Sequence, residues 1–392
     1  MYPWVSESKP IRFMHQNYCF YCLHQTIGIV VRFFTLFIFV GMEQHLLSNW
    51  IAKRKARKED LHAASLFEQL KNGDRTVLSQ CITLIESSLQ SDQLIANELI
   101  KYCLPIAGNS IRIGITGVPG VGKSTFIESF GTTLVEKGKK VAVLAIDPSS
   151  SSTGGSILGD KTRMQELSTN PNVYIRPSAA GTTLGGVARK TREAIILCEA
   201  AGFDAVIIET VGVGQSETLV HSMVDFFLLL MLAGAGDELQ GIKRGIMEMA
   251  DALVITKADG ENQLKAEQAS RQYANAMHLF PPKQSQWVVP SFTCSAYTNS
   301  NIDKVWEVIT SFDNQTKING WFVQHRKTQD KFWLLETLKE KIIGHFFSDA
   351  NLLNALKEVE GAVENGEKSS FQGADELYYL FSQKKSSDGN GI

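Results

Sequence analysis

The chain has 392 residues, of which 44% are hydrophobic and 20% charged, and its formal net charge is −2. This length is sufficient for two or three domains with buried cores. The nearly balanced charge argues against a nucleic-acid partner, because such partners require a strongly basic surface.

The first segment, residues 1–41, differs from the rest of the chain. Ile27–Gly41 is strongly apolar, but it spans only fifteen residues and contains Arg32. A membrane-spanning helix needs about 20 apolar residues, so we do not expect a membrane partner. We interpret residues 1–41 as a doubtful, mis-assigned extension upstream of a natural start at Met42. A membrane anchor or a targeting segment is the alternative.

The cysteines indicate the compartment. Four of the six are isolated in the sequence, which favours reduced thiols in a cytoplasmic protein over a disulfide framework. The remaining two belong to a cluster that could supply half of a zinc site, with no second pair of cysteines to complete it. This cluster comprises His15, Cys19, Cys22 and His24.

Residues 42–108 are predicted to form an N-terminal helical domain. Asn72-Gly73-Asp74 offers a break followed by an N-cap. Apolar residues then recur at helical spacing, namely Val77, Leu78, Cys81, Ile82, Leu84 and Ile85.

Residues 109–312 alternate between strand and helix patterns, which predicts an α/β domain with a mostly parallel sheet flanked by helices. The expected strands are Ile111–Thr116, Lys140–Ile146, Asn172–Arg176, Ala205–Glu209, Phe226–Leu232, Ala252–Thr256 and Trp287–Thr293. The expected helices are Lys123–Glu136, Gly186–Ala201, Leu239–Met249, Glu261–Met277 and Ile302–Thr310.

Residues 313–383 return to a helical pattern, and residues 384–392 are predicted to be a disordered tail. The apolar face around Leu335, Leu338 and Ile342 is wider than one supporting surface requires. We expect this face either to be packed on two sides within one chain or to be buried in a homodimer.

The most informative motif is Gly117–Ser124, which fits the phosphate-loop pattern G-x-x-x-x-G-K-[ST] between a predicted strand and a predicted helix. Backbone N–H groups of such a loop surround phosphate oxygens, and the helix points its positive end at them. Lys123 would reach the β- and γ-phosphates, and Ser124 would ligate Mg²⁺. The nucleotide-binding residues expected here are Gly117, Val118, Pro119, Gly120, Val121, Gly122, Lys123, Ser124 and Thr125.

Acidic residues follow two of the predicted strands and would meet at the carboxyl edge of the sheet. Asp147 could bind Mg²⁺ directly or through water, and the polar run after it carries Asp160. Glu209, followed by Gly212, resembles the D-x-x-G pattern in which the acid holds the metal shell and the glycine N–H meets the γ-phosphate.

Thr256-Lys257-Ala258-Asp259 follows a later strand and predicts base recognition. The Asp259 carboxylate could accept from N1–H and the 2-amino group of guanine, and adenine has neither donor. Lys257 would lie along the base, and Ser295-Ala296 fits the loop at the base edge. GTP is therefore favoured over ATP, although Thr256 occupies a position where Asn usually ties this loop to the phosphate loop.

These segments together resemble the MeaB/ArgK family of methylmalonyl-CoA mutase-associated GTPases, which belong to the SIMIBI class. The matching strings are VPGVGKSTF, DPSSSSTGGSILGDKTRM, GTTLGGVARKT, ETVGVGQSE and GAGDELQGIKRGIME. The resemblance implies GTP hydrolysis to GDP with Mg²⁺, in the service of an adenosylcobalamin-dependent acyl-CoA mutase. It also implies gated cobalamin delivery, protection or reactivation of the mutase, and a homodimer formed through C-terminal helices.

The resemblance also implies site roles. Lys123, Asp160 and Glu209 match phosphate- and Mg²⁺-site positions, together with Ser124 and Asp147. The loop around Gln240 and Lys243 matches a third switch that responds to the mutase, so Lys243 joins the expected catalytic residues.

Two other functions remain open at this point. A transport-linked ATPase or kinase for basic amino acids would prefer ATP and would act with a membrane partner. A metal-insertion GTPase would usually carry Cys/His clusters near the nucleotide, and none occurs in residues 109–312 of the sequence.

Overall fold

The computed structural model describes residues 62–146, 164–177, 184–210, 216–234 and 244–388. The chain divides into two units, Met1–His62 and Ala63–Ile392, and the description below concerns the second. The apolar segment Ile27–Gly41, Met42 and the His/Cys cluster near the N-terminus all lie outside the described residues. The finer domain boundaries expected from the sequence stay predictions.

Three helices begin the second unit: α2 (Ala63–Lys71), α3 (Arg75–Glu86) and α4 (Gln90–Cys103). The predicted N-cap is confirmed, because the Asp74 side chain accepts hydrogen bonds from the backbone N–H groups of Thr76 and Val77. The apolar positions predicted on this helix are all buried, so α3 packs through the face that its sequence pattern indicates.

A seven-stranded sheet follows, in the order β3-β2-β4-β1-β5-β6-β7, and all of its pairs are parallel. The predicted α/β class with a parallel sheet is confirmed. Its strands are β1 (Ile111–Gly117), β2 (Val141–Ile146), β3 (Val173–Arg176), β4 (Ala205–Thr210), β5 (Phe226–Met231), β6 (Ala252–Ile255) and β7 (Ser291–Thr293).

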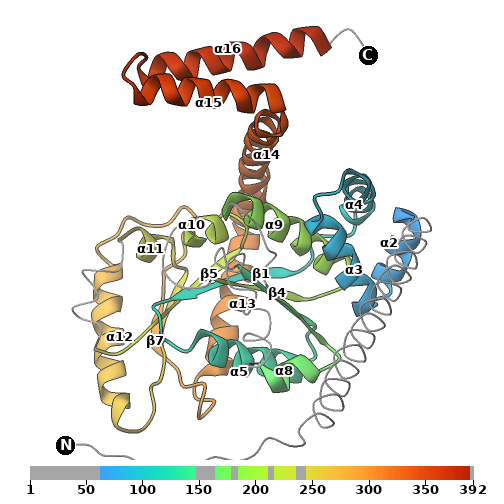
Figure 1. The fold of residues 1–392 in the computed structure, drawn as a ribbon. Helices are drawn as coiled ribbons and strands as arrows, with labels where there is room; N and C mark the ends of the chain where they lie inside the picture. The colour runs from blue at the N-terminus through green and yellow to red at the C-terminus, as the bar shows by residue number, and fades with distance from the viewer. Residues whose placement is uncertain (1–61, 147–163, 178–183, 211–215, 235–243, 389–392) are drawn as a thin grey trace, which may run out of the picture. The chain divides into compact units, whose positions relative to one another are not determined.

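Helices cover both faces of this sheet (Figure 1). One face holds α5 (Lys123–Glu136), α8 (Gln165–Thr169) and α13 (Ile302–Ile318), and its apolar cluster includes Phe130, Phe226 and Phe312. The Phe226 and Phe312 rings meet edge to face, with their centroids 5.1 Å apart. The other face carries α9 (Leu184–Ala200), α10 (Ser216–His221) and α11 (Arg244–Met249), whereas η1 (Gly260–Asn262) and α12 (Gln263–Met277) lead from β6 to β7.

The chain ends in three helices: α14 (Trp321–Ser348), α15 (Ala350–Glu364) and α16 (Ser370–Asp388). In the part of the chain that the structure describes, the wide apolar face predicted on α14 is not packed on two sides. Trp333 is buried, but several large apolar side chains are between 41% and 68% exposed, namely Leu334, Leu335, Leu338, Ile342, Ile343 and Phe347.

Some predicted boundaries were wrong. The last strand begins at Ser291 rather than Trp287, because Pro290 has no N–H to donate to the ladder and Val288 is exposed. Helix α13 continues to Ile318 instead of ending at Thr310. Helix α16 runs to Asp388, so the start of the tail predicted to be disordered is helical. The short helices α8 and α10 were not predicted.

Candidate functional site

The phosphate-loop sequence begins at the end of β1, between strands β4 and β5. At Gly117, a Cβ atom would lie 2.5 Å from the carbonyl oxygen of Leu230 on β5, so no side chain fits there. Gly122 caps α5 with a φ of 90°, a left-handed conformation that favours glycine. The loop therefore turns tightly at the carboxyl edge of the sheet and presents the N-terminus of α5.

Lys123 is the first residue of α5, and its Nζ donates a hydrogen bond to the Gly117 carbonyl oxygen at 3.0 Å. Burial lowers the pKa of Lys123, whereas the negative charges of Glu209 and Glu217 act in the opposite direction. The ammonium group thus spans the loop and faces two carboxylates within the fold.

Ser124 and Glu209 bring oxygen atoms together beside this lysine. The Ser124 Oγ lies 3.5 Å from Glu209 Oε1, and Glu209 is only 5% exposed near the end of β4. A serine hydroxyl and a carboxylate are ligands that suit a hard divalent cation such as Mg²⁺. The pair therefore fits the predicted metal site, whereas Asp147, Asp160 and Gly212 lie outside the described residues.

The predicted base loop is joined directly to the phosphate loop. Thr256 is buried, and its Oγ1 donates to the Val121 carbonyl oxygen at 2.8 Å and lies 3.3 Å from the Met231 carbonyl oxygen. Lys257 Nζ donates to the Gly120 carbonyl oxygen at 2.8 Å. The link that Asn usually provides is made here by a threonine hydroxyl and a lysine ammonium.

The backbone of the base loop is held in an uncommon conformation. Lys257 has a φ of 55°, and the Asn262 side-chain amide donates to its carbonyl oxygen at 2.7 Å. Asn262 was not singled out in the sequence, because its contact depends on the turn that η1 forms.

Asp259 and Ser295 meet across the predicted base site. The Ser295 hydroxyl donates to Asp259 Oδ2, and Ser295 is fully buried. The Thr298 N–H donates to the same hydroxyl oxygen at 3.2 Å. Asp259 itself is half-buried, so its carboxylate is oriented on one side and accessible on the other.

A hollow of about 500 Å³ opens between α5, α8 and the loop after β7. It is lined by Thr125 and Ala296, two of the residues predicted to contact the nucleotide, and also by Glu128, Ser129, Thr132, Gln165, Glu166 and Asn299. The structure thus brings the phosphate-loop helix and the base-edge loop to one open space.

Residues 78–351 match the family model of the methylmalonyl Co-A mutase-associated GTPase MeaB. The chain belongs to the MeaB family. It is 43% identical over 314 residues to the GTPase ArgK of Escherichia coli, with 80% of this chain and 95% of that protein covered. It is 41% identical over 337 residues to the methylmalonic aciduria type A homolog, mitochondrial, of Mus musculus, covering 83% and 81%.

A solved structure supports the same assignment. The crystal structure of an LAO/AO transport system kinase matches with a TM-score of 0.64 and 36% identity, over 82% of this chain and 97% of that one. This MeaB-family protein is therefore a P-loop GTPase that binds guanine nucleotide. The predicted family, fold class and enzymatic class are confirmed.

One buried residue of this MeaB-family GTPase was missed by the sequence analysis, and two predicted residues are not described. Glu217 on α10 is only 1% exposed and was not among the predicted site residues, although the string ETVGVGQSE contains it. Gln240 and Lys243, from the predicted third switch, lie outside the described residues.

Among the residues that the structure describes, no three His, Cys, Asp or Glu side chains are grouped to hold a metal ion. Every helix in the described ranges is too short or too polar to cross a membrane.

Proposed function

We propose that this GTPase is a chaperone of an adenosylcobalamin-dependent acyl-CoA mutase of the methylmalonyl-CoA type. In this proposal GTP hydrolysis gates cobalamin loading and protects or reactivates the mutase. The observation that carries it is the match to the mutase-associated family over residues 78–351, which includes the phosphate loop and the base loop. The name of the mouse relative, a methylmalonic aciduria type A homolog, supports the same process.

In the proposed phosphate site, the N–H groups from Gly120 to Thr125 bind phosphate oxygens at the positive end of α5. Lys123 Nζ leaves the Gly117 carbonyl oxygen, where it now lies at 3.0 Å, and neutralises the β- and γ-phosphates. This exchange is favourable because Lys123 then gains a strong anionic partner in place of a neutral carbonyl.

Mg²⁺ is proposed to bind to Ser124 and Glu209, with further ligands from Asp147 and Asp160, which follow β2 in the sequence. The distance of 3.5 Å between Ser124 Oγ and Glu209 Oε1 supports a shared ligand sphere. When bound, the metal would offset the charge that builds up on the phosphate oxygens. Glu209 and Asp160 are proposed to orient the attacking water, and Gly212 to meet the γ-phosphate.

Base selectivity is proposed to come from Asp259, whose carboxylate accepts from the N1–H and the 2-amino group of guanine. Ser295 supports this role because it donates to Asp259 Oδ2 and so fixes the rotamer of the carboxylate. Lys257 would cover one face of the base with its aliphatic stem. Ser295 and Ala296 would line the base edge.

The partner surface is proposed to lie on the C-terminal helices. The exposed apolar row on α14 supports a homodimer, because contiguous apolar side chains of this size are seldom left in water. We also propose that Lys243 and Gln240 respond to the mutase, and that residues 42–108, 109–312 and 313–383 act as the cap, the GTPase domain and the dimerisation segment.

The decisive experiment compares GTP and ATP turnover by the purified protein, with and without an adenosylcobalamin-dependent mutase. We expect slow GTP hydrolysis that the mutase accelerates. ATP preference without any response to a mutase would reject the proposal. Lys243→Ala should lose the mutase stimulation and retain basal turnover, and unchanged stimulation would remove Lys243 from the third switch.

A second candidate follows from the name of the related LAO/AO transport system kinase. A kinase that serves basic amino acid transport would use ATP. It would transfer the γ-phosphoryl group of ATP to a protein or to a small substrate. Incubation with γ-labelled ATP and GTP distinguishes the two functions. A labelled protein product would favour the kinase, and release of labelled inorganic phosphate from GTP alone would favour the GTPase chaperone.

The compartment is proposed to be the cytoplasm. The four cysteines described, Cys81, Cys103, Cys198 and Cys294, are all free and buried, as expected in a reducing compartment. Fluorescent fusions of the full chain and of a chain starting at Met42 test this proposal. Mitochondrial or membrane localisation of the full chain would contradict it, as would recovery of a peptide from residues 1–41 in a membrane fraction.

A further inference from the structure

The segment that follows α10, residues 222–225, is held by one face of α14. The Trp333 indole N–H donates to the Ser222 carbonyl oxygen at 3.1 Å. The Gln329 side-chain amide donates to the Val224 carbonyl oxygen at 2.7 Å. These two bonds satisfy backbone acceptors in a connection that lies outside any helix or strand.

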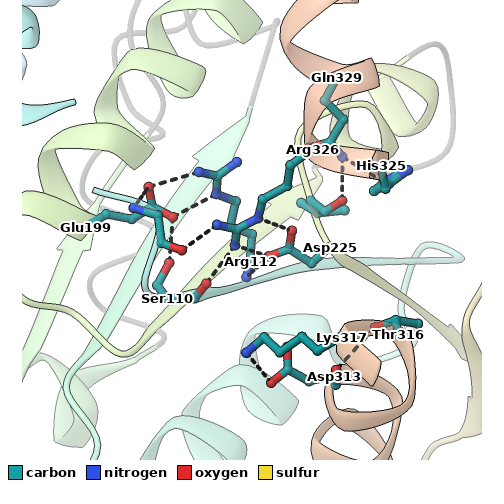
Figure 2. Close-up of polar contacts among 12 residues, drawn as sticks. Ser110, Arg112, Glu199, Asp225, Asp313, Thr316, Lys317, His325, Arg326 and Gln329 are labelled. Carbon is teal, nitrogen blue, oxygen red and sulfur yellow. Dashed lines mark hydrogen bonds and ion pairs between the residues drawn. The ribbon is translucent and has the colours of Figure 1, made fainter. Parts of the chain in front are cut away.

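A third contact is an ion pair with Asp225, the last residue before β5. Arg326 donates from Nε to Asp225 Oδ1 at 2.7 Å and from Nη2 to Oδ2 at 2.6 Å (Figure 2). Such a bidentate pair fixes both direction and distance, so it specifies how α14 docks.

Arg326, Gln329 and Trp333 are three and four residues apart on α14, which places them on one side of the helix. Gln329 is 3% exposed and Trp333 is 6% exposed. We call these three side chains the α14 grip. Because Gln329 and Trp333 are buried, and all three side chains bond to consecutive parts of residues 222–225, we expect this segment and the first half of α14 to move together.

Helix α10 itself contacts elements that carry the nucleotide site. A Cβ atom at Gly114 of β1 would lie 3.0 Å from a methyl carbon of Val220 and of Val224, so α10 and β1 are in close contact. Glu217 of α10 is buried, and its charge acts on Lys123. In the sequence, α10 begins at Ser216, directly after the motif that contains Glu209 and Gly212. A shift of α10 would therefore reach both the phosphate loop and the α14 grip.

We propose that α10 and the α14 grip form a mechanical link that passes the nucleotide state to the exposed apolar half of α14, residues 334–348. The inference rests on the proposed GTPase cycle and adds the route by which that cycle reaches the C-terminal helices. Most of the exposed row, from Leu334 to Phe347, follows Trp333, so the grip lies immediately before the proposed partner surface. Close packing transmits such a displacement because the core deforms little.

The test measures backbone hydrogen exchange of residues 334–348 in the full chain, loaded either with GDP or with a non-hydrolysable GTP analogue and Mg²⁺. We expect the two nucleotide states to differ in exchange in the wild type. Trp333→Phe and Gln329→Met each remove one grip hydrogen bond and should lose that difference; methionine retains the volume of glutamine, and phenylalanine retains an aromatic ring of smaller size. Their nucleotide affinity and basal GTP turnover should be unchanged, since neither residue belongs to the nucleotide site.

Thr328→Ala and Lys331→Ala are matched controls, because both side chains are exposed on α14 between the grip residues. Both controls should retain the wild-type difference. Saturation with both nucleotides but identical exchange in the wild type would overturn the link and leave the proposed GTPase function intact. Persistence of the difference in both grip variants would also overturn it. Failure to bind either nucleotide, seen first by calorimetry, would reject the proposed function and the link together.

Discussion

The Thr256 hydroxyl donates a hydrogen bond to the Val121 carbonyl oxygen, 135 residues earlier in the chain, and so joins the predicted base loop to the phosphate loop. From the sequence alone, the threonine made base binding uncertain, because asparagine usually makes this connection. In the structure Thr256 is buried and its hydroxyl donates to a carbonyl oxygen of the phosphate loop, so the two loops are joined without an asparagine.

Thr256→Val tests the hydroxyl, because valine has nearly the same shape but cannot donate. We expect GDP affinity to fall about tenfold, since one buried hydrogen bond contributes about 1 kcal/mol and an unpaired carbonyl adds to the loss. Titration calorimetry measures this change. Thr256→Ser retains the hydroxyl and should bind GDP nearly as well as the wild type.

A second measurement shows whether Thr256→Val disturbs the position of Asp259 or only weakens nucleotide binding in general. If Thr256 holds Asp259 in place, Thr256→Val should also reduce the preference for GDP over inosine diphosphate, which lacks the 2-amino group. A loss of stability alone would leave this ratio unchanged at temperatures below unfolding. An unaltered ratio with unaltered affinity would mean that the hydroxyl has no role in base binding.

Lys123→Ala tests the phosphate site. The substitution removes the cation proposed to neutralise the β- and γ-phosphates, so we expect GTP turnover to fall by at least about 100-fold. The protein should remain folded, because the ammonium donates its hydrogen bond to a single carbonyl oxygen, although loss of its charge near Glu209 and Glu217 should lower the melting temperature somewhat. Phosphate release and circular dichroism measure the two properties.

Lys137→Ala is the matched control at the other end of α5. Its ion pair with Asp303 is largely exposed, and such pairs contribute little to stability. Turnover in this variant should equal that of the wild type. Wild-type turnover in Lys123→Ala itself would mean that the phosphate loop is wrongly assigned.

The sequence was most informative where a function depends on neighbouring residues. Gly117–Ser124 carries its own turn, lysine and helix start, so its position at the end of β1 could be predicted from one stretch. The ion pair between Arg326 and Asp225 joins residues 101 positions apart, and no local pattern indicates it. The contact between Trp333 and Ser222 is equally non-local, and it depends on how α14 crosses the end of a helix that the sequence analysis did not predict.

Arg326→Ala tests the non-local network at the amino edge of the sheet. The same guanidinium also donates to the carbonyl oxygens of Gly108 and Ser110, at 2.6 and 2.7 Å. Removing it leaves the buried Asp225 carboxylate without its cation, which should lower the free energy of unfolding by about 3–5 kcal/mol. Urea unfolding measures the loss, and Lys327→Ala, an exposed neighbour, should change little.

A second substitution identifies the cause of that loss. Burial alone would raise the pKa of Asp225, but the hydrogen bonds and charge of Arg326 outweigh it and hold that pKa below its usual value. Asp225→Asn in the Arg326→Ala background removes the stranded charge and should recover part of the stability. No recovery would indicate that Arg326 acts through packing on Phe322, whose ring centroid lies 4.4 Å from its guanidinium carbon.

We expect the folded protein to lose stability in acid because of His221, the last residue of α10. The pKa of His221 is lowered to about 4, mainly by burial; Asp251 acts in the opposite direction, and the charge of Lys283 and the neighbouring His325 contribute to the lowering. The imidazole is therefore neutral in the folded protein near pH 5, whereas in the unfolded chain it takes up a proton below about pH 6.5. Stability from this residue is complete above pH 6.5 and is lost as the pH falls toward 4.

Urea unfolding at pH 7.5 and at pH 5 measures this effect, and we expect the free energy of unfolding to fall by about 2 kcal/mol through His221. The ion pair of Asp225 does not contribute in this window, because a lowered carboxyl pKa is felt only below its usual value near 4. In His221→Phe, which retains an aromatic ring beside Phe227, the part of the loss due to His221 should disappear. An identical loss in this variant would show that His221 is not the group that takes up the proton.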